Sequence, residues 1–381
     1  MILGIDASNI RVGGGVTHLV ELLRVAEPSK FGFSKVVVWG CARTLGQIED
    51  RPDWLEKRHE AVFERGVVSR AFWQSRVLSR RAREENCDVL FVPGGSFRGN
   101  FFPIVSMSQN LLPFEWRELK RFGFALMTLK MVALRYTQGT TFKRADGVLF
   151  LTEYAKRAVE RAISYQIPNS AVVPLGLHDR FSVEASAERL SAAYGPSRPC
   201  KLLYVSVVDV YKHQWHVVEA ARILREQGCH VTLDIVGAAV GAAEIRLNEA
   251  IRKADPGGSY IHYRGKVPYE TISEYYRNCD VNVFASSCEN MPNILLEAMA
   301  SGVPVACSKL GPMPEVLKDA GVYFDPECPV EIASAIKELI DSPDLRVSCV
   351  RKAKALVVQY SWRRCADETF AFLEHVAQRR G

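Results

Sequence analysis

The chain has 381 residues and a mass of 42.6 kDa, enough for two or three domains of about 150 residues each. Hydrophobic residues make up 48% of it and charged residues 24%, which excludes a disordered chain, a collagen-like repeat and a disulfide-rich miniprotein. The net charge of +6 is concentrated in the first half, because residues 1–190 carry 27 Lys and Arg against 20 Asp and Glu. Such basic patches attract phosphate-rich partners.

The sequence shows neither a membrane span nor a secretory leader. No window approaches eighteen consecutive uncharged apolar residues, and the first ten residues lack a basic region followed by an apolar one. The ten cysteines are scattered without a C-x-x-C pair, so neither a zinc site nor a disulfide framework is indicated. We therefore expect a cytoplasmic protein with reduced thiols.

Short apolar runs alternate with longer amphipathic stretches, and this rhythm is typical of a doubly wound parallel sheet. The expected strands of a first series are residues 2–6, 35–39, 89–92, 104–108, 147–151 and 171–173. A second series comprises residues 202–205, 230–236, 261–263, 281–285, 304–307 and 322–324, with helical patterns such as 215–227 between them. The sheet pattern thus occurs twice.

These series predict two Rossmann-like α/β domains that face each other across a cleft. We expect an N-terminal domain over residues 1–180, a polar linker over 181–199, a second domain over 200–360 and a closing helix over 361–381 that returns to the first domain. Ligands of such sheets bind beyond the carboxyl ends of the strands, at the point where the strand order reverses. The cleft is therefore the expected binding site.

The strongest local signal is the stretch 288–304. An apolar strand runs into a polar loop with Glu289, and a helix then begins near Pro292 or Asn293, contains Glu297 and stops at Gly302. The start of a helix after a parallel strand favours a diphosphate. Two carboxylates near that anion would repel it unless they bind hydroxyl groups, so a sugar nucleotide is the natural ligand.

At this point the sequence resembles the retaining glycosyltransferases of the GT-B fold, family GT4 (glycosyl transferases group 1), whose hallmark is E-x7-E. Glu289 and Glu297 match that spacing, and the resemblance covers nearly the whole chain. The flanking motifs that carry it are Gly13-Gly14-Gly15-Val16, Arg144-Ala145-Asp146, Val173-Pro174-Leu175-Gly176, Gly265-Lys266-Val267, Asn278-Cys279-Asp280-Val281 and Tyr360-Ser361-Trp362.

The resemblance implies a role for each matching position. Glu297 should hold the nucleotide ribose, Glu289 a hydroxyl of the donor sugar, and Lys212 the diphosphate leaving group. Further donor contacts are implied for Met291, Pro292, Asn293, Lys266, Val267, Gly14 and Gly15. Gln109 stands where the family usually has a catalytic His, and we include it among the catalytic candidates.

The chain departs from the family pattern at three places. Val207 replaces an Arg that often precedes the Lys, so a phosphate contact is missing or comes from Lys266 or Arg264. Gln109 can donate a hydrogen bond but cannot hold a proton. The loop after Glu289 is Asn290-Met291-Pro292-Asn293, a variant that we associate with bacterial polysaccharide enzymes.

The mechanism implied is retention by front-face substitution, in which the leaving diphosphate helps to deprotonate the acceptor. No D-x-D triplet occurs, which agrees with an enzyme that needs no metal and no other cofactor. The G-x-G-x-x-G spacing of a dinucleotide site is also absent, which disfavours hydride transfer.

Plainer interpretations stay open for several residues. Glu289 and Glu297 are, in isolation, a loop acid and a helix-face acid, and Lys212 could be a surface lysine. Gly13 to Gly15 could be a flexible turn instead of a contact to acceptor or phosphate. His18 and His213 are more typical of local packing than of catalysis.

Residues 111–136 combine many apolar side chains with basic ones. They suit a buried helix or an amphipathic surface helix that touches anionic lipid. Nucleic acid is not an expected partner, because no binding module for it is present and the charge is modest.

The sequence therefore predicts a retaining glycosyltransferase that transfers a hexose from a nucleoside diphosphate sugar to a glycan or polyprenyl-linked acceptor. Its place would be the synthesis of bacterial surface polysaccharide, such as O-antigen or capsule, at the inner face of the plasma membrane. The alternatives are a non-catalytic GT-B scaffold that binds nucleotide or glycan in an assembly complex, and an epimerase acting on the nucleotide sugar.

Overall fold

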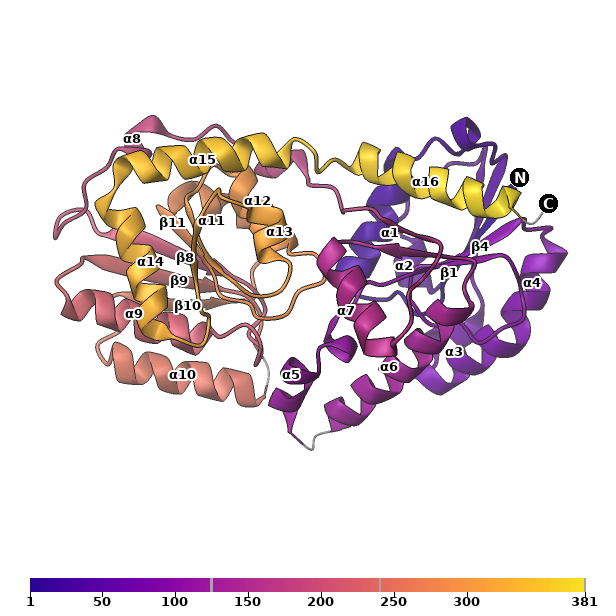
Figure 1. Ribbon diagram of the computed structural model, residues 1–381, viewed down its shortest axis with the longest axis horizontal. Helices are drawn as coiled ribbons and strands as arrows, with labels where there is room; N and C mark the ends of the chain where they lie inside the picture. Colours follow the sequence, from indigo (N-terminus) through magenta and orange to yellow (C-terminus); the bar gives the residue numbers. More distant parts are fainter. Residues whose placement is uncertain (124–125, 240, 380–381) are drawn as a thin grey trace. The chain divides into compact units, whose positions relative to one another are not determined.

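The computed structural model describes residues 1–123, 126–239 and 241–379, which form two compact units of parallel α/β structure. The first unit comprises Met1–Leu119, Gly123–Gly176 and Tyr360–Gly381, and the second comprises Lys120–Phe122 and Leu177–Gln359. Helices cover both faces of each sheet (Figure 1). The prediction of two doubly wound domains is confirmed.

The sheet of the first unit has the strand order β3-β2-β1-β4-β5-β6-β7, with every pair parallel. Its strands are β1 (Ile2–Ala7), β2 (Lys35–Gly40), β3 (Leu55–Arg58), β4 (Val89–Val92), β5 (Ile104–Met107), β6 (Gly147–Phe150) and β7 (Ser170–Val172). The chain winds outward from β1 to β3 and then returns to β4, so the strand order reverses between β1 and β4. Strand β3 was not predicted, because its sequence LEKR holds a single apolar residue.

The first unit closes with the C-terminal helix of the chain. Its helices are α1 (Gly14–Val25), α2 (Ala42–Leu45), α3 (Val67–Trp73), α4 (Ser79–Glu84), α5 (Trp116–Leu119), α6 (Leu126–Arg144), α7 (Glu153–Ile163) and α16 (Trp362–Gln378), with a π-helical turn η3 (Gln74–Leu78) between α3 and α4 and short 3₁₀ turns η1 (Pro28–Phe31), η2 (Ala61–Glu64) and η4 (Leu112–Phe114). Helix α16 packs against α1, β4 and β5. Gly147 lies directly beneath Phe372 and Val376 of α16, where a Cβ would meet them within 2.9 Å.

The second sheet has the order β10-β9-β8-β11-β12-β13, again all parallel, and it reverses between β8 and β11. Its strands are β8 (Cys200–Val205), β9 (Val231–Val236), β10 (Ile261–Gly265), β11 (Val281–Phe284), β12 (Val305–Ser308) and β13 (Val322–Phe324). The helical segments of this unit are η5 (Lys120–Phe122), η6 (Asp179–Phe181), α8 (Ala187–Leu190), α9 (Gln214–Glu226), α10 (Ala242–Ala254), η7 (Tyr269–Thr271), α11 (Ile272–Asn278), α12 (Asn293–Ala300), α13 (Met313–Leu317), α14 (Pro329–Asp341) and α15 (Pro343–Val357).

Two segments differ from expectation. Residues 181–199, which we expected to be a linker, pack as part of the second unit, because the buried Arg346 donates to the carbonyls of Leu190 and Ala192. Residues 111–136, of which 124 and 125 lie outside the described residues, form η4, α5, η5 and the start of α6 instead of one helix. Leu126 and Leu129 on α6 are exposed, whereas Leu119 and Met131 are buried.

Candidate functional site

Two loops meet at the point where the second sheet reverses its strand order. One follows β8 and carries Lys212, and the other follows β11 and carries Glu289. The Ser287 N–H donates to the Tyr211 carbonyl at 2.8 Å, and Ser287 Oγ lies 2.9 Å from His213 Nε2. His213 thus holds the loops together, in agreement with the plainer interpretation of that residue. This is the position at which open α/β sheets bind ligands.

Lys212 and Glu289 form an ion pair in which Lys212 Nζ donates to Glu289 Oε1. The two side chains are only 6% and 15% exposed, so this is not a surface lysine or a solvated loop acid. Lys212 Nζ also lies 5.1 Å from the centre of the Tyr211 ring. The strand-end loops therefore supply one sheltered cation and one carboxylate in direct contact.

Helix α12 begins immediately after this pair. Pro292 precedes its first residue, Asn293, and no side chain caps the start of the helix. Met291 and Pro292 are buried, and Gly302 follows the last turn with a φ of 65°, a conformation that suits Gly after a helix. The predicted beginning and end of this helix are therefore found, and the backbone N–H groups at its start, which no side chain caps, are groups of the kind that bind anions.

Glu297 lies one turn into α12 and is buried, with 5% of its surface exposed. Its Oε1 accepts a hydrogen bond from Tyr269 Oη at 2.8 Å. Burial raises the pKa of Glu297 to about 7, although the Tyr269 hydrogen bond and the charge of Arg180 act in the opposite direction. A carboxylate in this state gains from further hydrogen-bond donors, such as a pair of neighbouring hydroxyls.

The surroundings of Glu297 were missed by sequence reasoning. The Arg180 guanidinium lies 5.1 Å from the centre of the Tyr269 ring, and the His178 ring is 6.2 Å from it. Arg180 and His178 come from residues that we assigned to the N-terminal domain but that belong to the second unit, and they carry no motif that would connect them to Glu297. Residues 177–181, Leu-His-Asp-Arg-Phe, show no local pattern that marks this contact.

The other residues considered for phosphate contact lie at the end of β10 and in the loop after β8. Lys266 and Val267 follow β10, and Lys266 is exposed. Arg264, which we considered as a substitute for the missing family Arg, is paired with Asp234 at 2.6 Å. Val207 is about half exposed and contributes no charge. Because Arg264 is already paired, Lys266 is the remaining candidate of the two substitutes.

Gln109, Gly14 and Gly15 lie in the first unit, and the structure brings two of them together. Gln109 Nε2 lies 2.9 Å from Nδ1 of His18, a buried residue of α1 whose pKa is lowered to about 4 by burial. A Cβ on Gly15 would lie 2.8 Å from Gln109 Oε1, whereas a Cβ on Gly14 would meet no atom within 4 Å. Gly15 thus lets the Gln109 amide approach α1.

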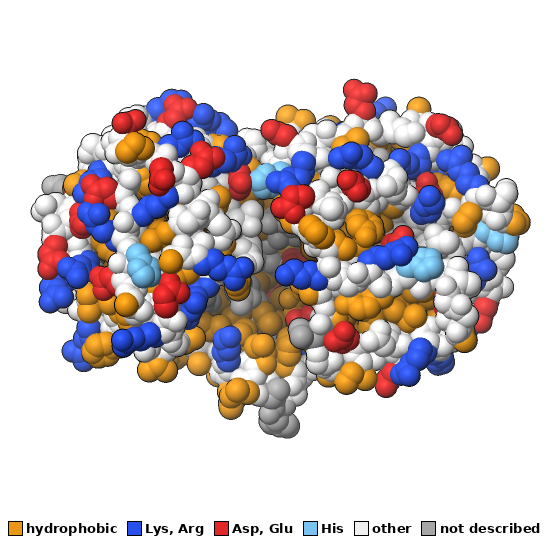
Figure 2. Space-filling view, turned by 180° about the vertical axis from the view of Figure 1, so that it is seen from behind, with side chains coloured by type: hydrophobic (Ala, Val, Ile, Leu, Met, Phe, Trp, Pro, Cys, Tyr) orange, Lys and Arg blue, Asp and Glu red, His pale blue; other side chains and the backbone are white. Residues whose placement is uncertain are grey.

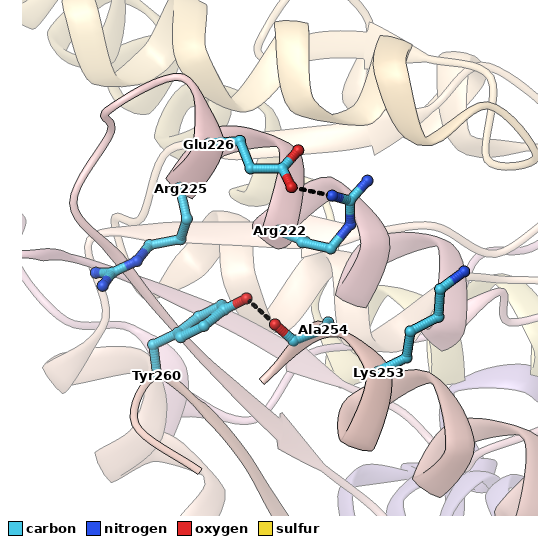
Figure 3. A pocket seen from close by; sticks show the side chains of 6 residues that line it. All are labelled: Arg222, Arg225, Glu226, Lys253, Ala254 and Tyr260. Carbon is cyan, nitrogen blue, oxygen red and sulfur yellow. Dashed lines mark hydrogen bonds and ion pairs between the residues drawn. The ribbon is translucent and has the colours of Figure 1, made fainter. Parts of the chain in front are cut away.

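A separate hollow of about 460 Å³ lies at the ends of α9 and α10 (Figure 3). Its polar groups bind one another: Arg222 contacts Glu226, Tyr260 Oη donates to the Ala254 carbonyl, and Arg225 lies over the Tyr260 ring. We assign it no function.

Within residues 1–123, 126–239 and 241–379, His, Cys, Asp and Glu side chains do not gather in groups of three that could hold a metal ion. None of the helices in this part combines the length and apolar character needed to cross a membrane.

Comparison with known proteins bears on both units. Residues 188–356 match the family described as glycosyl transferases group 1. The O-antigen chain mannosyltransferase B of Escherichia coli is 24% identical over 241 residues, which cover 62% of this chain and 63% of that protein. The chain spans less than two thirds of the length of the curated relatives it matches.

Solved structures of low sequence identity share the fold. The sucrose-phosphate synthase of Thermosynechococcus elongatus has a TM-score of 0.73 at 16% identity, with 97% of both chains covered. Anabaena Alr3699/HepE in complex with UDP has a TM-score of 0.69 at 16% identity, with 97% of this chain and 98% of that chain covered. These likenesses confirm the GT-B fold.

Proposed function

We propose that this chain is a member of the glycosyl transferases group 1, the family that residues 188–356 match, and that it is a retaining hexosyltransferase. Its donor would be a nucleoside diphosphate sugar and its acceptor a hydroxyl of a glycan or polyprenyl-linked glycan. The relative from E. coli is a mannosyltransferase of the O-antigen chain, which supports bacterial surface polysaccharide as the product class. The complex of HepE with UDP supports a nucleotide as part of the donor.

One observation carries the proposal: Lys212 and Glu289 meet at the reversal point of the second sheet, beside the uncapped start of α12. The diphosphate of the donor needs positive groups that become more effective as its bond to the sugar breaks. Lys212 and the dipole of α12 provide them, and Glu289 supplies an acceptor for a sugar hydroxyl. Glu297, with Tyr269, would hold the ribose. Lys266 and Val267, at the end of β10, and Gly14 and Gly15 would add the remaining donor contacts.

The proposed reaction needs no protein nucleophile. The bond between the sugar anomeric carbon and the diphosphate oxygen breaks, and the electron pair leaves with the diphosphate. The acceptor oxygen bonds to the same face of that carbon, and its proton passes to the departing diphosphate. Gln109 would position sugar hydroxyls as a hydrogen-bond donor, and neither a metal nor a cofactor is required in this scheme.

Contact with the membrane surface is a further part of the proposal. Leu126, Leu129 and Tyr136 on α6 are exposed, and Lys130 is exposed among them. Apolar side chains lie among Lys and Arg side chains on the surface of the first unit (Figure 2). This combination suits the interface of anionic lipid, so we place the enzyme peripherally at the inner face of the plasma membrane.

The test is transfer from a panel of UDP, GDP, dTDP and ADP sugars to polyprenyl-linked acceptors, with Glu297→Ala and Lys212→Ala as controls. We expect turnover with one base, retention of anomeric configuration, and loss of donor use in both variants. Donor binding without turnover in any pairing would replace the enzyme by the non-catalytic scaffold. Near-wild-type turnover in both variants would contradict the site.

A further inference from the structure

An arginine is buried where the first sheet reverses its strand order. Arg70 of α3 is only 7% exposed. Its Nε donates to Asn9 Oδ1 at 3.1 Å, in the loop after β1, and its Nη1 donates to the Arg65 carbonyl at 2.6 Å. Both acceptors are uncharged. Among the residues that the structure describes, no carboxylate lies within ion-pair distance of this guanidinium.

The charge of Arg70 is not compensated by its neighbours. Buried charges in proteins are normally paired, because leaving water is costly for an ion. Burial and the nearby charge of Arg11 both lower the pKa of Arg70. Glu64 lies 3.6 Å from Arg11 Nη2, but it also accepts the Ala42 N–H at 2.9 Å. The side chains of Arg11, Arg70 and Glu64 therefore carry two positive charges and one negative charge.

The loops after β1 and β4 are joined at the same place. Gln74, on the π-helical turn η3, donates to Asp6 Oδ2 at 2.5 Å and to the Ser96 carbonyl at 2.7 Å, which joins the loops after β1 and β4. The second oxygen of Asp6 accepts from Ser8 Oγ at 2.6 Å. π-Helical turns are frequent at functional sites. Asp6 is thus hydrogen-bonded to its own neighbours, which leaves Arg70 without an ion pair in the described part of the chain and Arg11 paired with Glu64 only at 3.6 Å.

We infer that Arg70, Arg11 and Asn9 form an anion subsite at the reversal point of the first sheet, which takes a phosphate or diphosphate group of the acceptor. This rests on the proposed function, which requires an acceptor, and it specifies the acceptor's chemistry. A guanidinium matches phosphate oxygens with two parallel hydrogen bonds. Asn9 accepts from Arg70 through its Oδ1, and its amide nitrogen remains as a further donor.

Exposed apolar side chains near this subsite in the sequence bear on the source of that phosphate. Val12 follows Arg11, and Val67, Val68 and Phe72 stand on α3 around Arg70; all four side chains are well exposed. An acceptor whose phosphate carries an apolar lipid chain would cover these four side chains, whereas a free sugar phosphate would not. Both kinds of acceptor carry the phosphate group, and the contribution of the lipid chain is tested separately.

The experiment measures the affinity of the full chain for inorganic pyrophosphate and for farnesyl diphosphate by titration calorimetry. It uses the Lys212→Met/Glu289→Gln background, which removes the diphosphate cation of the second unit. Arg11→Gln is compared there with Arg51→Gln, an equal loss of charge at an exposed arginine of the same unit that pairs with Glu49. Arg70→Lys, which keeps the charge but loses the planar fork, is the second variant.

We expect Arg11→Gln to weaken pyrophosphate binding about tenfold, as for one lost hydrogen bond to a charged group, and Arg51→Gln to leave it unchanged. Equal affinity in these two variants would overturn the subsite, even if Arg70→Lys fails to fold. Tighter binding of farnesyl diphosphate than of pyrophosphate, lost in Phe72→Asp, would assign the phosphate to a lipid, and equal binding would assign it to a soluble acceptor. UDP and GDP titrated into the wild-type chain test the donor separately, so a failed proposed function would leave this result standing.

Discussion

Lys212 Nζ donates to Glu289 Oε1 although the two residues are 77 positions apart in the chain. Strands β8 and β11 are neighbours in the sheet, so the loops that follow them emerge side by side. This contact is what turns two separate family motifs into one site. Because the pair is sheltered from water, each partner depends on the other for its charge balance.

The first prediction concerns stability. Lys212→Met leaves the Glu289 carboxylate buried without its cation, so we expect the free energy of unfolding to fall by about 3–5 kcal/mol. Adding Glu289→Gln removes that uncompensated charge and should recover most of the loss. Urea unfolding measures both changes, and Lys266→Met, at an exposed lysine, is the control. Equal stability of the single and double variants would show that the pair is not energetically coupled.

The second prediction separates stability from activity in the same variants. We expect Lys212→Met/Glu289→Gln to fold, but it lacks the cation that stabilises the leaving diphosphate, so donor turnover should fall roughly 100- to 1,000-fold. The readout is release of nucleoside diphosphate from the donor that binds best. Activity that returns together with stability would mean that Lys212 acts only through folding.

The third prediction concerns pH, because the pKa of Glu297 is raised to about 7. A carboxyl with a raised pKa binds its proton more tightly in the folded chain than in the unfolded chain. Its contribution to stability is therefore fully present below its ordinary pKa of 4.5 and is lost as the pH rises through about 7. Ribose hydroxyls favour the ionised form, so the donor should have the opposite dependence and bind more weakly as the pH falls below 7.

Calorimetric titration of an intact nucleotide sugar between about pH 6 and pH 8 measures this, since its diphosphate does not titrate in that range. We expect the affinity to approach a tenfold loss per pH unit on the acid side. Tyr269→Phe removes a hydrogen bond that lowers the pKa, so the midpoint should move to higher pH. Glu297→Gln should abolish the dependence, and a flat wild-type profile would contradict the role of Glu297.

The sequence predicted those parts of the molecule that local pattern determines. Glu289 and Glu297 could be assigned to a loop and to the first turn of a helix, because the Pro and Gly at the ends of α12 mark its limits. Tyr269 and Arg180 could not be assigned to Glu297, because nothing local links η7 and η6 to α12. Arg70 likewise looked like one of many basic residues, because its partner Asn9 lies 61 positions away in the chain and no local pattern links the two.

The fourth prediction concerns the approach of Gln109 to α1. In Gly15→Ala the new Cβ meets Gln109 Oε1 at 2.8 Å, so the Gln109 amide must move and its contact with the buried His18 is lost. We expect the free energy of unfolding to fall by about 1 kcal/mol, as for one lost hydrogen bond. Gly14→Ala is the matched control, because it adds the same methyl group one residue earlier, where no atom lies within 4 Å. Gly14→Ala should be neutral or raise the free energy of unfolding by up to about 1 kcal/mol. Thermal unfolding of the two variants measures this difference, and equal melting temperatures would show that the Gln109 amide does not depend on the space beside Gly15.

The fifth prediction concerns the exposed face of α6. Leu126 and Leu129 are 82% and 68% exposed, so replacing both with Asp removes apolar surface without disturbing the core. If this face enters anionic lipid, flotation with vesicles that contain anionic phospholipid should decrease strongly in the Leu126→Asp/Leu129→Asp variant. Val358→Asp is the control, because Val358 is equally exposed, at 81%, but lies on the second unit. Binding should also weaken as salt screens the basic residues around α6. Flotation that is absent at every salt concentration, or that is equal in all three proteins, would remove the membrane from the proposal while leaving the donor site unaffected.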